Sequence, residues 1–132
     1  MPIIATDTYR LSNLVKKELW PEFGYTRAVV TVNEAAAKTY AVGTVLGKVT
    51  ATGKYKIAVE TAVDGSKVAA AIVLGDYAIP GTTDTKVLVM VRGAAIVSKA
   101  ALVLDATYND DTKKAAVYDA LEALRILTNE TI

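Results

Sequence analysis

Hydrophobic and polar residues alternate along the middle of the chain in the pattern of short β-strands. Valine and other β-branched residues dominate the runs RAVVTVNE (27–34) and AVGTVLGKV (41–49), and such runs are typical of strands. The run KVLVMVRGAAIVSKAALVL (86–104) has apolar residues on both alternating faces, which suits strands covered on each side. Gly93 divides this run into two strands. The pattern therefore predicts a mainly β protein.

Turn signals separate the predicted strands. ATGK (51–54) places a glycine where a hairpin turn needs a positive φ angle, and the pair Asp64–Gly65 is typical of a type I′ hairpin. VAAAIVLGDYAI (68–79) predicts one long strand that bends at its glycine. PGTTDT (80–85) predicts a loop, because Pro-Gly pairs favour turns.

The C-terminal region predicts one amphipathic helix. NDDTKKAAVYDALEAL (109–124) offers Asp110 or Asp111 as the N-cap residue. Its apolar residues recur at the helical spacing i, i+3, i+4 and i+7, and they are Val117, Ala120, Leu121 and Leu124. RILTNETI (125–132) then returns to strand-like residues.

The first 26 residues differ from the rest of the chain. They contain its only tryptophan and its only phenylalanine, Trp20 and Phe23. Four apolar residues recur at helical spacing and predict a short amphipathic turn that ends at Pro21; they are Leu11, Leu14, Val15 and Leu19. We therefore divide the chain into an N-terminal arm, residues 1–26, and a single β-rich domain, residues 27–132. Composition leaves two alternatives open: the arm covers its own domain, or it docks onto another chain.

Length and charge limit the classes of partner. The 132 residues suit one domain, and 15 basic residues nearly balance 14 acidic ones. A chain with so little net charge lacks the field that draws proteins to nucleic acid or to anionic membranes. Its longest uncharged apolar stretch, residues 68–74, is too short to span a bilayer, and MPIIATDTYRL lacks the features of a secretory signal. We therefore expect neither nucleic acid nor a membrane as a partner.

The residue types also limit the chemistry. The chain has no histidine and no cysteine, which removes histidine bases, thiol nucleophiles, disulfides and the common zinc sites. Carboxylates remain, but the best adjacent pair suits a helix cap, and four others lie beside turn signals: Asp64, Asp76, Asp84 and Asp105. Gly47 and the pair Gly53–Lys54 are one residue too far apart for a phosphate-binding loop. We expect no catalytic residue, no metal and no cofactor.

Five segments of the chain carry a family resemblance by their order and spacing. They are LSNLVKKELWPEFGYTRAVVTV, AVGTVLGKVTATGKYKI, DGSKVAAAIVLGD, VLVMVRGAAIVSKAALVL and ALEALRIL. Through them the sequence resembles the bacteriophage lambda-type head decoration (capsid cement) protein family over most of its length. The resemblance implies a structural virion protein without catalytic activity, made in the host cytoplasm. It implies a homotrimer that binds the outer capsid surface at threefold and quasi-threefold positions and stabilises the expanded shell.

Pattern and resemblance together set the expectations for fold and partners. We expect a mainly β fold, a small bent-ribbon, β-clip-like or incomplete barrel, with one C-terminal α-helix and an extended N-terminal arm. The expected partners are the major capsid protein and further copies of the chain, with no small-molecule substrate. The residues expected to contact the capsid are Tyr9, Leu11, Leu14, Val15, Leu19, Trp20, Phe23 and Tyr25. The small residues expected to let strands of neighbouring copies approach are Ala69, Ala70, Ala71, Ala94 and Ala95.

Two other functional classes stay open from the residues alone. A carboxylate-dependent hydrolase would need two acids brought together from separate strands, with Asp76 and Asp105 as candidates. A ligand-binding β-barrel that stacks bases or sugars would need exposed aromatics on its strands, where only Tyr40, Tyr55 and Tyr77 are available.

Overall fold

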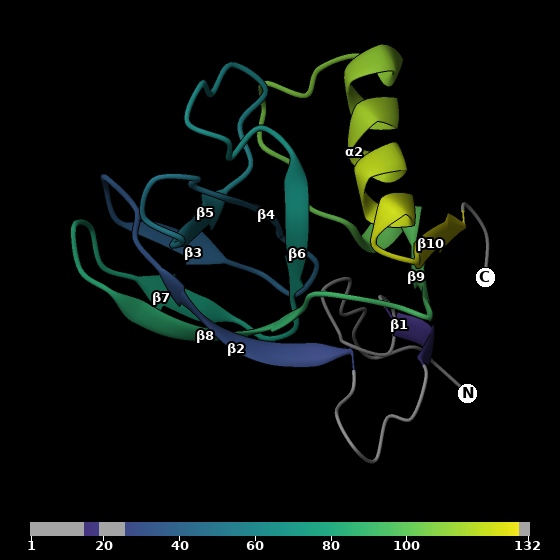
Figure 1. Ribbon diagram of the computed structural model, residues 1–132, viewed down its shortest axis with the longest axis horizontal. Helices are drawn as coiled ribbons and strands as arrows, with labels where there is room; N and C mark the ends of the chain where they lie inside the picture. The colour runs from purple at the N-terminus through teal and green to yellow at the C-terminus, as the bar shows by residue number, and fades with distance from the viewer. Residues whose placement is uncertain (1–14, 19–25, 130–132) are drawn as a thin grey trace, which may run out of the picture.

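The computed structural model describes residues 15–18 and 26–129, and it combines a closed β-barrel with a second sheet and one helix (Figure 1). Around the barrel the strands follow the order β2 (Arg27–Val32), β5 (Tyr55–Ile57), β4 (Val45–Lys48), β6 (Ala69–Val73) and β8 (Thr85–Met90). The longest pairing is antiparallel, between β2 and β8, and runs from Arg27 opposite Met90 to Val32 opposite Thr85. This pairing joins the two ends of the strand order and so closes the barrel.

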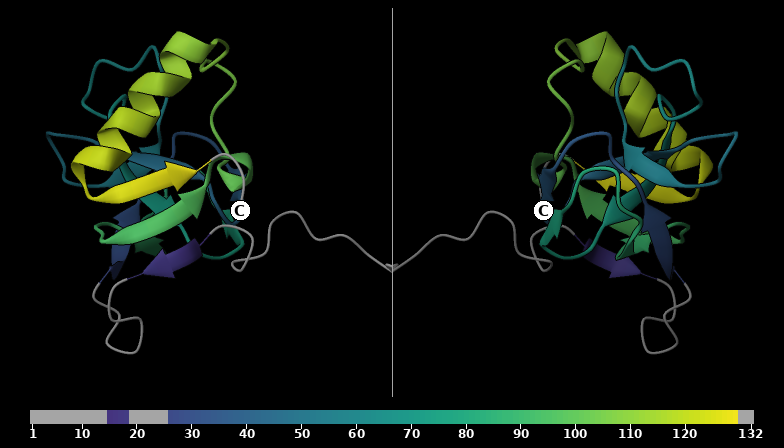
Figure 2. Two further views of the ribbon diagram at one scale, coloured as in Figure 1. Left: turned by 90° about the vertical axis from the view of Figure 1, so that its right-hand side faces the viewer. Right: turned by 90° about the vertical axis from the view of Figure 1, so that its left-hand side faces the viewer.

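A second layer lies beside the barrel (Figure 2). Its sheet has β9 (Ala95–Ser98) in the centre, with β1 (Val15–Glu18) antiparallel on one side and β10 (Ile126–Asn129) parallel on the other. The 3₁₀ helix η2 (Lys99–Ala101) follows β9, and α2 (Asp111–Ala123) precedes β10. A separate antiparallel ribbon joins β3 (Lys38–Tyr40) to β7 (Tyr77–Ile79).

Two hydrophobic clusters hold these layers together. The cluster inside the barrel consists of Val32, Tyr40, Leu46, Ala71, Val73, Ile79, Val87 and Val89. The outer cluster joins the barrel to α2 and to the second sheet, with Ile72, Met90, Val97, Val117, Leu121 and Ile126 among its members. Neighbouring residues of β6 alternate between the two clusters, which is why the run AAAIV has no polar face.

One buried carboxylate ties several elements of the barrel to each other. Glu34, directly after β2, is only 2% exposed. Its carboxylate accepts a short hydrogen bond from the Tyr40 hydroxyl, and Oε2 also accepts from the Ile57 amide at 2.8 Å. Its backbone carbonyl accepts from the Thr82 amide at 2.7 Å. Burial, together with the hydrogen bond to Glu34 and its charge, raises the pKa of Tyr40, so this hydroxyl stays protonated and donates.

Most of the sequence-based predictions of the fold are confirmed. The protein is mainly β with one C-terminal helix, as predicted. Its barrel was expected to be incomplete and is instead closed by the pairing of β2 with β8. The turn at residues 51–54 joins the antiparallel strands β4 and β5, with Gly53 at φ +72°. Gly93 lies between β8 and β9. Helix α2 begins after Asp110, whose carboxylate accepts the Lys113 amide at 2.8 Å as an N-cap does.

Three local predictions are wrong, each because of a contact with a distant segment. The helical turn predicted over residues 11–19 is a strand where the structure describes it, since β1 pairs with β9 and a short isolated helix is marginal in water. The predicted type I′ hairpin at 64–65 has a positive φ only at Gly65, and β5 and β6 flank β4 instead of pairing. The single strand predicted over 68–79 is two strands in different sheets, and Asp76 between them accepts the Val42 amide at 3.1 Å.

The buried hydrogen bond gives a first prediction. Tyr40→Phe removes the hydroxyl donor and leaves the Glu34 carboxylate buried with one fewer partner. We expect the free energy of unfolding to fall by about 1–3 kcal/mol, measured by urea denaturation. Tyr55→Phe is the matched control, because the structure shows no hydrogen bond between the Tyr55 hydroxyl and any described residue. Equal stability of the two variants would show that the bond to Glu34 contributes little.

Candidate functional site

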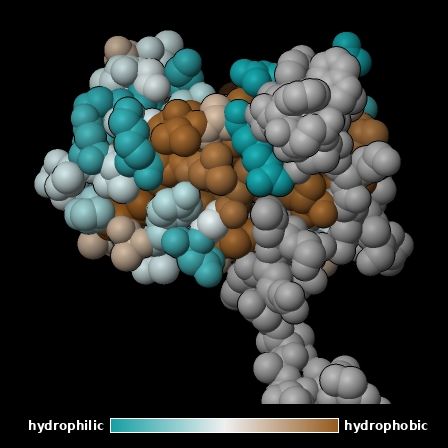
Figure 3. Space-filling model, turned by 90° about the horizontal axis from the view of Figure 1, so that it is seen from below, coloured by the Kyte–Doolittle hydropathy of each residue, from teal (hydrophilic) through white to brown (hydrophobic). Residues whose placement is uncertain are grey.

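The outer side of the β2–β8 pair presents two apolar side chains between polar ones, beside the point where the chain enters the barrel. Val29 of β2 is 63% exposed and lies opposite half-buried Leu88 of β8. We call this surface the β2–β8 face and define it by Arg27, Val29, Thr31, Lys86 and Leu88. These strands form the lower side of the molecule in Figure 1, and Figure 3 shows hydrophobic residues gathered on that side with hydrophilic ones next to them.

The strand β1 lies at the edge of the second sheet and leads toward the same side. Its antiparallel register places Val15 opposite Val97 and Glu18 opposite Ala95. Val15 is half-buried and packs against the outer hydrophobic cluster. Residues 19–25 connect β1 to the buried residue Thr26, whose carbonyl accepts the Val91 amide at 2.9 Å. Both ends of this connection are therefore fixed to the folded part of the chain.

Only part of the predicted contact residues can be placed. Of the arm residues, Val15 is described, whereas Tyr9, Leu11, Leu14, Leu19, Trp20, Phe23 and Tyr25 lie outside the described residues. Of the alanines predicted at a subunit interface, Ala69, Ala71 and Ala95 are at most 3% exposed in the single chain. Ala70 is half-buried and Ala94 is exposed, so only these two have side chains accessible to another copy.

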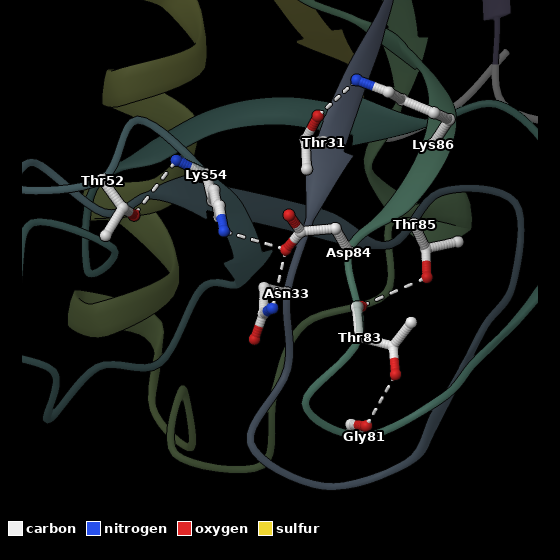
Figure 4. A network of polar contacts seen from close by, with 9 residues as sticks. All are labelled: Thr31, Asn33, Thr52, Lys54, Gly81, Thr83, Asp84, Thr85 and Lys86. Atoms are coloured by element: carbon white, nitrogen blue, oxygen red, sulfur yellow. Dashed lines mark hydrogen bonds and ion pairs between the residues drawn. The ribbon is translucent and has the colours of Figure 1, made fainter.

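A polar network occupies the far end of the β2–β8 face (Figure 4). The Asp84 carboxylate accepts a hydrogen bond from the Asn33 side chain at 2.8 Å and forms an ion pair with Lys54 Nζ at 2.9 Å. The hydrogen bond from Asn33 and then that from Lys54 lower the pKa of Asp84. Lys86 Nζ donates to Thr31 Oγ1 at 2.6 Å. These contacts link the ends of β2 and β5 to the loop that precedes β8.

The carboxylates considered for catalysis accept hydrogen bonds from backbone amides. Asp76 accepts the Val42 amide, and Asp105 accepts the amide of Thr107 at 3.1 Å and its hydroxyl at 2.8 Å. Asp64 accepts from Ser66 and pairs with Lys56 at 2.9 Å, and these contacts hold its pKa well below the usual range. The structure thus assigns Asp64 and Asp105 to local turns and Asp76 to a contact between distant segments. Within residues 15–18 and 26–129, no cluster of three acidic, histidine or cysteine side chains could hold a metal ion.

The three strand tyrosines do not form a stacking surface. Tyr40 is fully buried inside the barrel, and Tyr55 and Tyr77 are half-buried against the same cluster. The Tyr77 hydroxyl accepts the Leu88 amide at 3.1 Å, so it also has a structural contact. None of the helices in the described part of the chain is long and apolar enough to cross a membrane.

These features define the class of the protein. It is a small β-barrel protein whose surface suits binding to other macromolecules better than catalysis. A family model, Bacteriophage lambda head decoration protein D, matches residues 9–126, and the chain belongs to this family. No curated protein matches the chain in a sequence comparison. The protein is therefore a phage head decoration protein, a structural component of the virion that binds the capsid.

Sequence reasoning missed the β2–β8 face and the role of Glu34. Val29 looked like one more core residue in a valine-rich run, and only the barrel shows that its neighbours Val30 and Val32 take the inward positions. Glu34 stood at the end of that run as an ordinary loop acid.

The network at Asp84 gives a second prediction. A lowered pKa means that the folded state favours the ionised carboxylate, so the stabilisation is present above the pKa of an unfolded Asp, about 3.9, and is lost as the pH falls below it. We expect the melting temperature of Asp84→Asn to lie below that of the native chain at neutral pH, with the gap closing between about pH 5 and pH 2. Asp119→Asn, an exposed residue of α2, is the charge-matched control. A difference in melting temperature that stays constant over this pH range would contradict a stabilising role of the ionised Asp84 carboxylate.

Proposed function

We propose that the protein binds the outer surface of the phage head as a homotrimer, at threefold and quasi-threefold positions, and stabilises the expanded shell. Its partner there is the major capsid protein. It is made in the host cytoplasm and needs no cofactor. Residues 1–26 act as the capsid-binding arm and residues 27–132 as the decoration domain. The observation that carries the proposal, beside the family, is that β1, within the arm, pairs with β9 on the side of the molecule where the β2–β8 face lies.

The position of β1 supports strand addition as the way in which the arm binds. The described part of β1 pairs only with β9, so its other edge has backbone groups to offer to a further strand. The 14 residues before Val15 reach about 45–50 Å when extended. Such a reach spans from one capsid subunit to its neighbours. The apolar arm residues, Trp20 and Phe23 above all, then supply side-chain anchors, since aromatic residues dominate many binding interfaces.

The β2–β8 face supports a second contact area beside the arm. An exposed valine next to a half-buried leucine gains free energy when a partner covers both, at roughly 25 cal/mol per Å² of buried apolar surface. Capsid shells under internal pressure fail where neighbouring subunits separate, so a stabilising protein has to contact several of them. A trimer presents three equal sets of such contacts. Once one set binds, the others bind at high effective concentration, which strengthens attachment by about 10²–10⁴-fold.

Removal of the arm tests the main contact. Deletion of residues 2–14 retains β1 and its pairing with β9, so we expect a folded protein with an unchanged far-UV circular dichroism spectrum. We expect this variant to attach more weakly to purified undecorated heads, because the trimer loses three copies of the segment proposed to add as a strand, whereas Trp20 and Phe23 are retained. Electron microscopy of the mixed particles is the measurement, and the native chain should add density at the threefold and quasi-threefold positions. Full occupancy by the truncated chain would rule out the arm as the main contact.

A pair of point variants separates the β2–β8 face from the arm. Val29→Asp places a charge on the proposed contact area, and we expect at least about tenfold weaker attachment, because the carboxylate has to be desolvated. Val63→Asp is the matched control, since Val63 is fully exposed in the loop before β6, at the opposite side of the molecule in Figure 1. Equal attachment of the two variants would remove the β2–β8 face from the contact area.

The oligomeric state gives a further prediction. One chain has a mass of 14.0 kDa, and light scattering after gel filtration should report three times this value at micromolar concentration. Ala94→Arg and Ala70→Arg test the two accessible alanines of the predicted interface, and we expect loss of the trimer from either one. A native chain that elutes as a monomer at all concentrations would contradict the trimer.

A further inference from the structure

A hollow lies between α2 and the loop that leads into β6, away from the β2–β8 face. The loop and the N-terminal half of α2 lie at the top of Figure 1, whereas β2 and β8 lie at the bottom. The hollow has a volume of about 260 Å³. Its apolar walls come from Val68, Tyr108, Ala116, Val117 and Ala120. It is thus separate from the β2–β8 face.

The walls of the hollow are held in place by hydrogen bonds and by burial. The Tyr108 hydroxyl donates to the Lys67 carbonyl at 2.7 Å, which ties the loop to the segment before α2. Burial, with smaller contributions from the charges of Glu60 and Asp105, raises the pKa of Tyr108 and keeps this donor protonated. The Glu60 amide donates to Thr107 Oγ1 at 3.0 Å, which makes a second tie. A ligand would therefore meet a preformed site and would not have to order it.

The mouth of the hollow carries more positive than negative charge. Lys67, Lys113 and Glu60 line it. Lys67 Nζ lies 3.6 Å from a Glu60 carboxylate oxygen, so this pair is roughly neutral. Lys113 Nζ donates to the Asn109 side-chain oxygen at 3.2 Å, and no ion pair of this lysine is found among the described residues. An apolar interior with a cationic mouth matches a ligand that has one apolar end and one anionic end.

We propose that this hollow binds a small apolar carboxylate. Its aromatic or aliphatic group fills the space against Tyr108 and Val117, which are 4% and 2% exposed, and its carboxylate lies at Lys113 and Lys67. The volume is below the roughly 300–1,000 Å³ typical of sites for drug-sized ligands, so the apolar group is about the size of one phenyl ring. Alanine at positions 116 and 120 leaves the space open, because a larger side chain at either position would fill it. The site does not depend on attachment to the capsid.

The test uses 3-phenylpropionate as the probe and 3-phenylpropanol and 3-phenylpropylamine as its neutral and cationic counterparts. Titrations of the full chain are followed by amide chemical shifts in two-dimensional NMR. We expect saturable shifts at Val68 and Ala116 with the acid, and an affinity at least about fivefold higher than that of the alcohol, with the amine weaker still. Equal affinities for acid and amine, or no saturation by the acid at millimolar concentration, would overturn the proposal.

Two pairs of variants locate the site on the helix. Ala116→Leu fills the hollow and should abolish binding, whereas Ala115→Leu, on the neighbouring exposed position of α2, should leave it unchanged. Lys113→Gln should lower the affinity for the acid about three- to fivefold without affecting the affinity for the alcohol. Lys114→Gln should change neither affinity. All four positions are at least partly exposed, so the variants are expected to fold. Binding of the acid to Ala116→Leu as tightly as to the native chain would place the ligand elsewhere and overturn the proposal.

Discussion

The buried carboxylate of Glu34 is the constraint on which the barrel depends. An acid that is 2% exposed is costly unless donors satisfy it, and here the donors come from β3 and β5. Glu34 lies two residues after the end of β2, and its backbone carbonyl also accepts the Thr82 amide of the loop before β8. Correct placement of this one side chain therefore requires four segments to be in position together. β2 and β5 share only one paired residue in their register, so this hydrogen bonding closes the weakest joint of the barrel.

Closure of the barrel decides which residues remain for contacts with other molecules. Inside, the space is filled by the side chains of the inner cluster, which are those of valine, leucine, isoleucine, Ala71 and Tyr40. On the outside, α2 and the second sheet cover one flank through the outer hydrophobic cluster. Val29 of β2 remains exposed beside this cover, and Leu88 opposite it is half-buried against the outer cluster. A rigid barrel with one uncovered apolar side is a good support for binding, because little conformational freedom is lost when a partner covers it.

The sequence predicted those features that depend on neighbouring residues. Asp110 and the apolar spacing of α2 act within a few turns, and the turn at Gly53 needs only the two strands beside it. Features that depend on distant pairing were not predictable. Val15 was assigned to a helical turn because its partner in the sheet, Val97, is 82 positions away. The burial of Glu34 likewise depends on Ile57, 23 positions away, so nothing in the local pattern distinguished it from a surface acid.

The place of β1 also bears on how a decoration protein could carry load. The arm continues from a strand that pairs antiparallel with β9, and β9 is in turn paired with β10. A pull along β1 loads its hydrogen bonds to β9 together, because these bonds lie side by side along the strand, and it does not open them one after another. Since Val15 also packs on the outer cluster, the load passes to α2 and the barrel. If the arm were attached to a loop, the load would not be shared in this way, and its weak contacts would break one at a time. If residues 1–14 bind the capsid as proposed, the ordered edge strand that follows them supports attachment as much as the segment itself does.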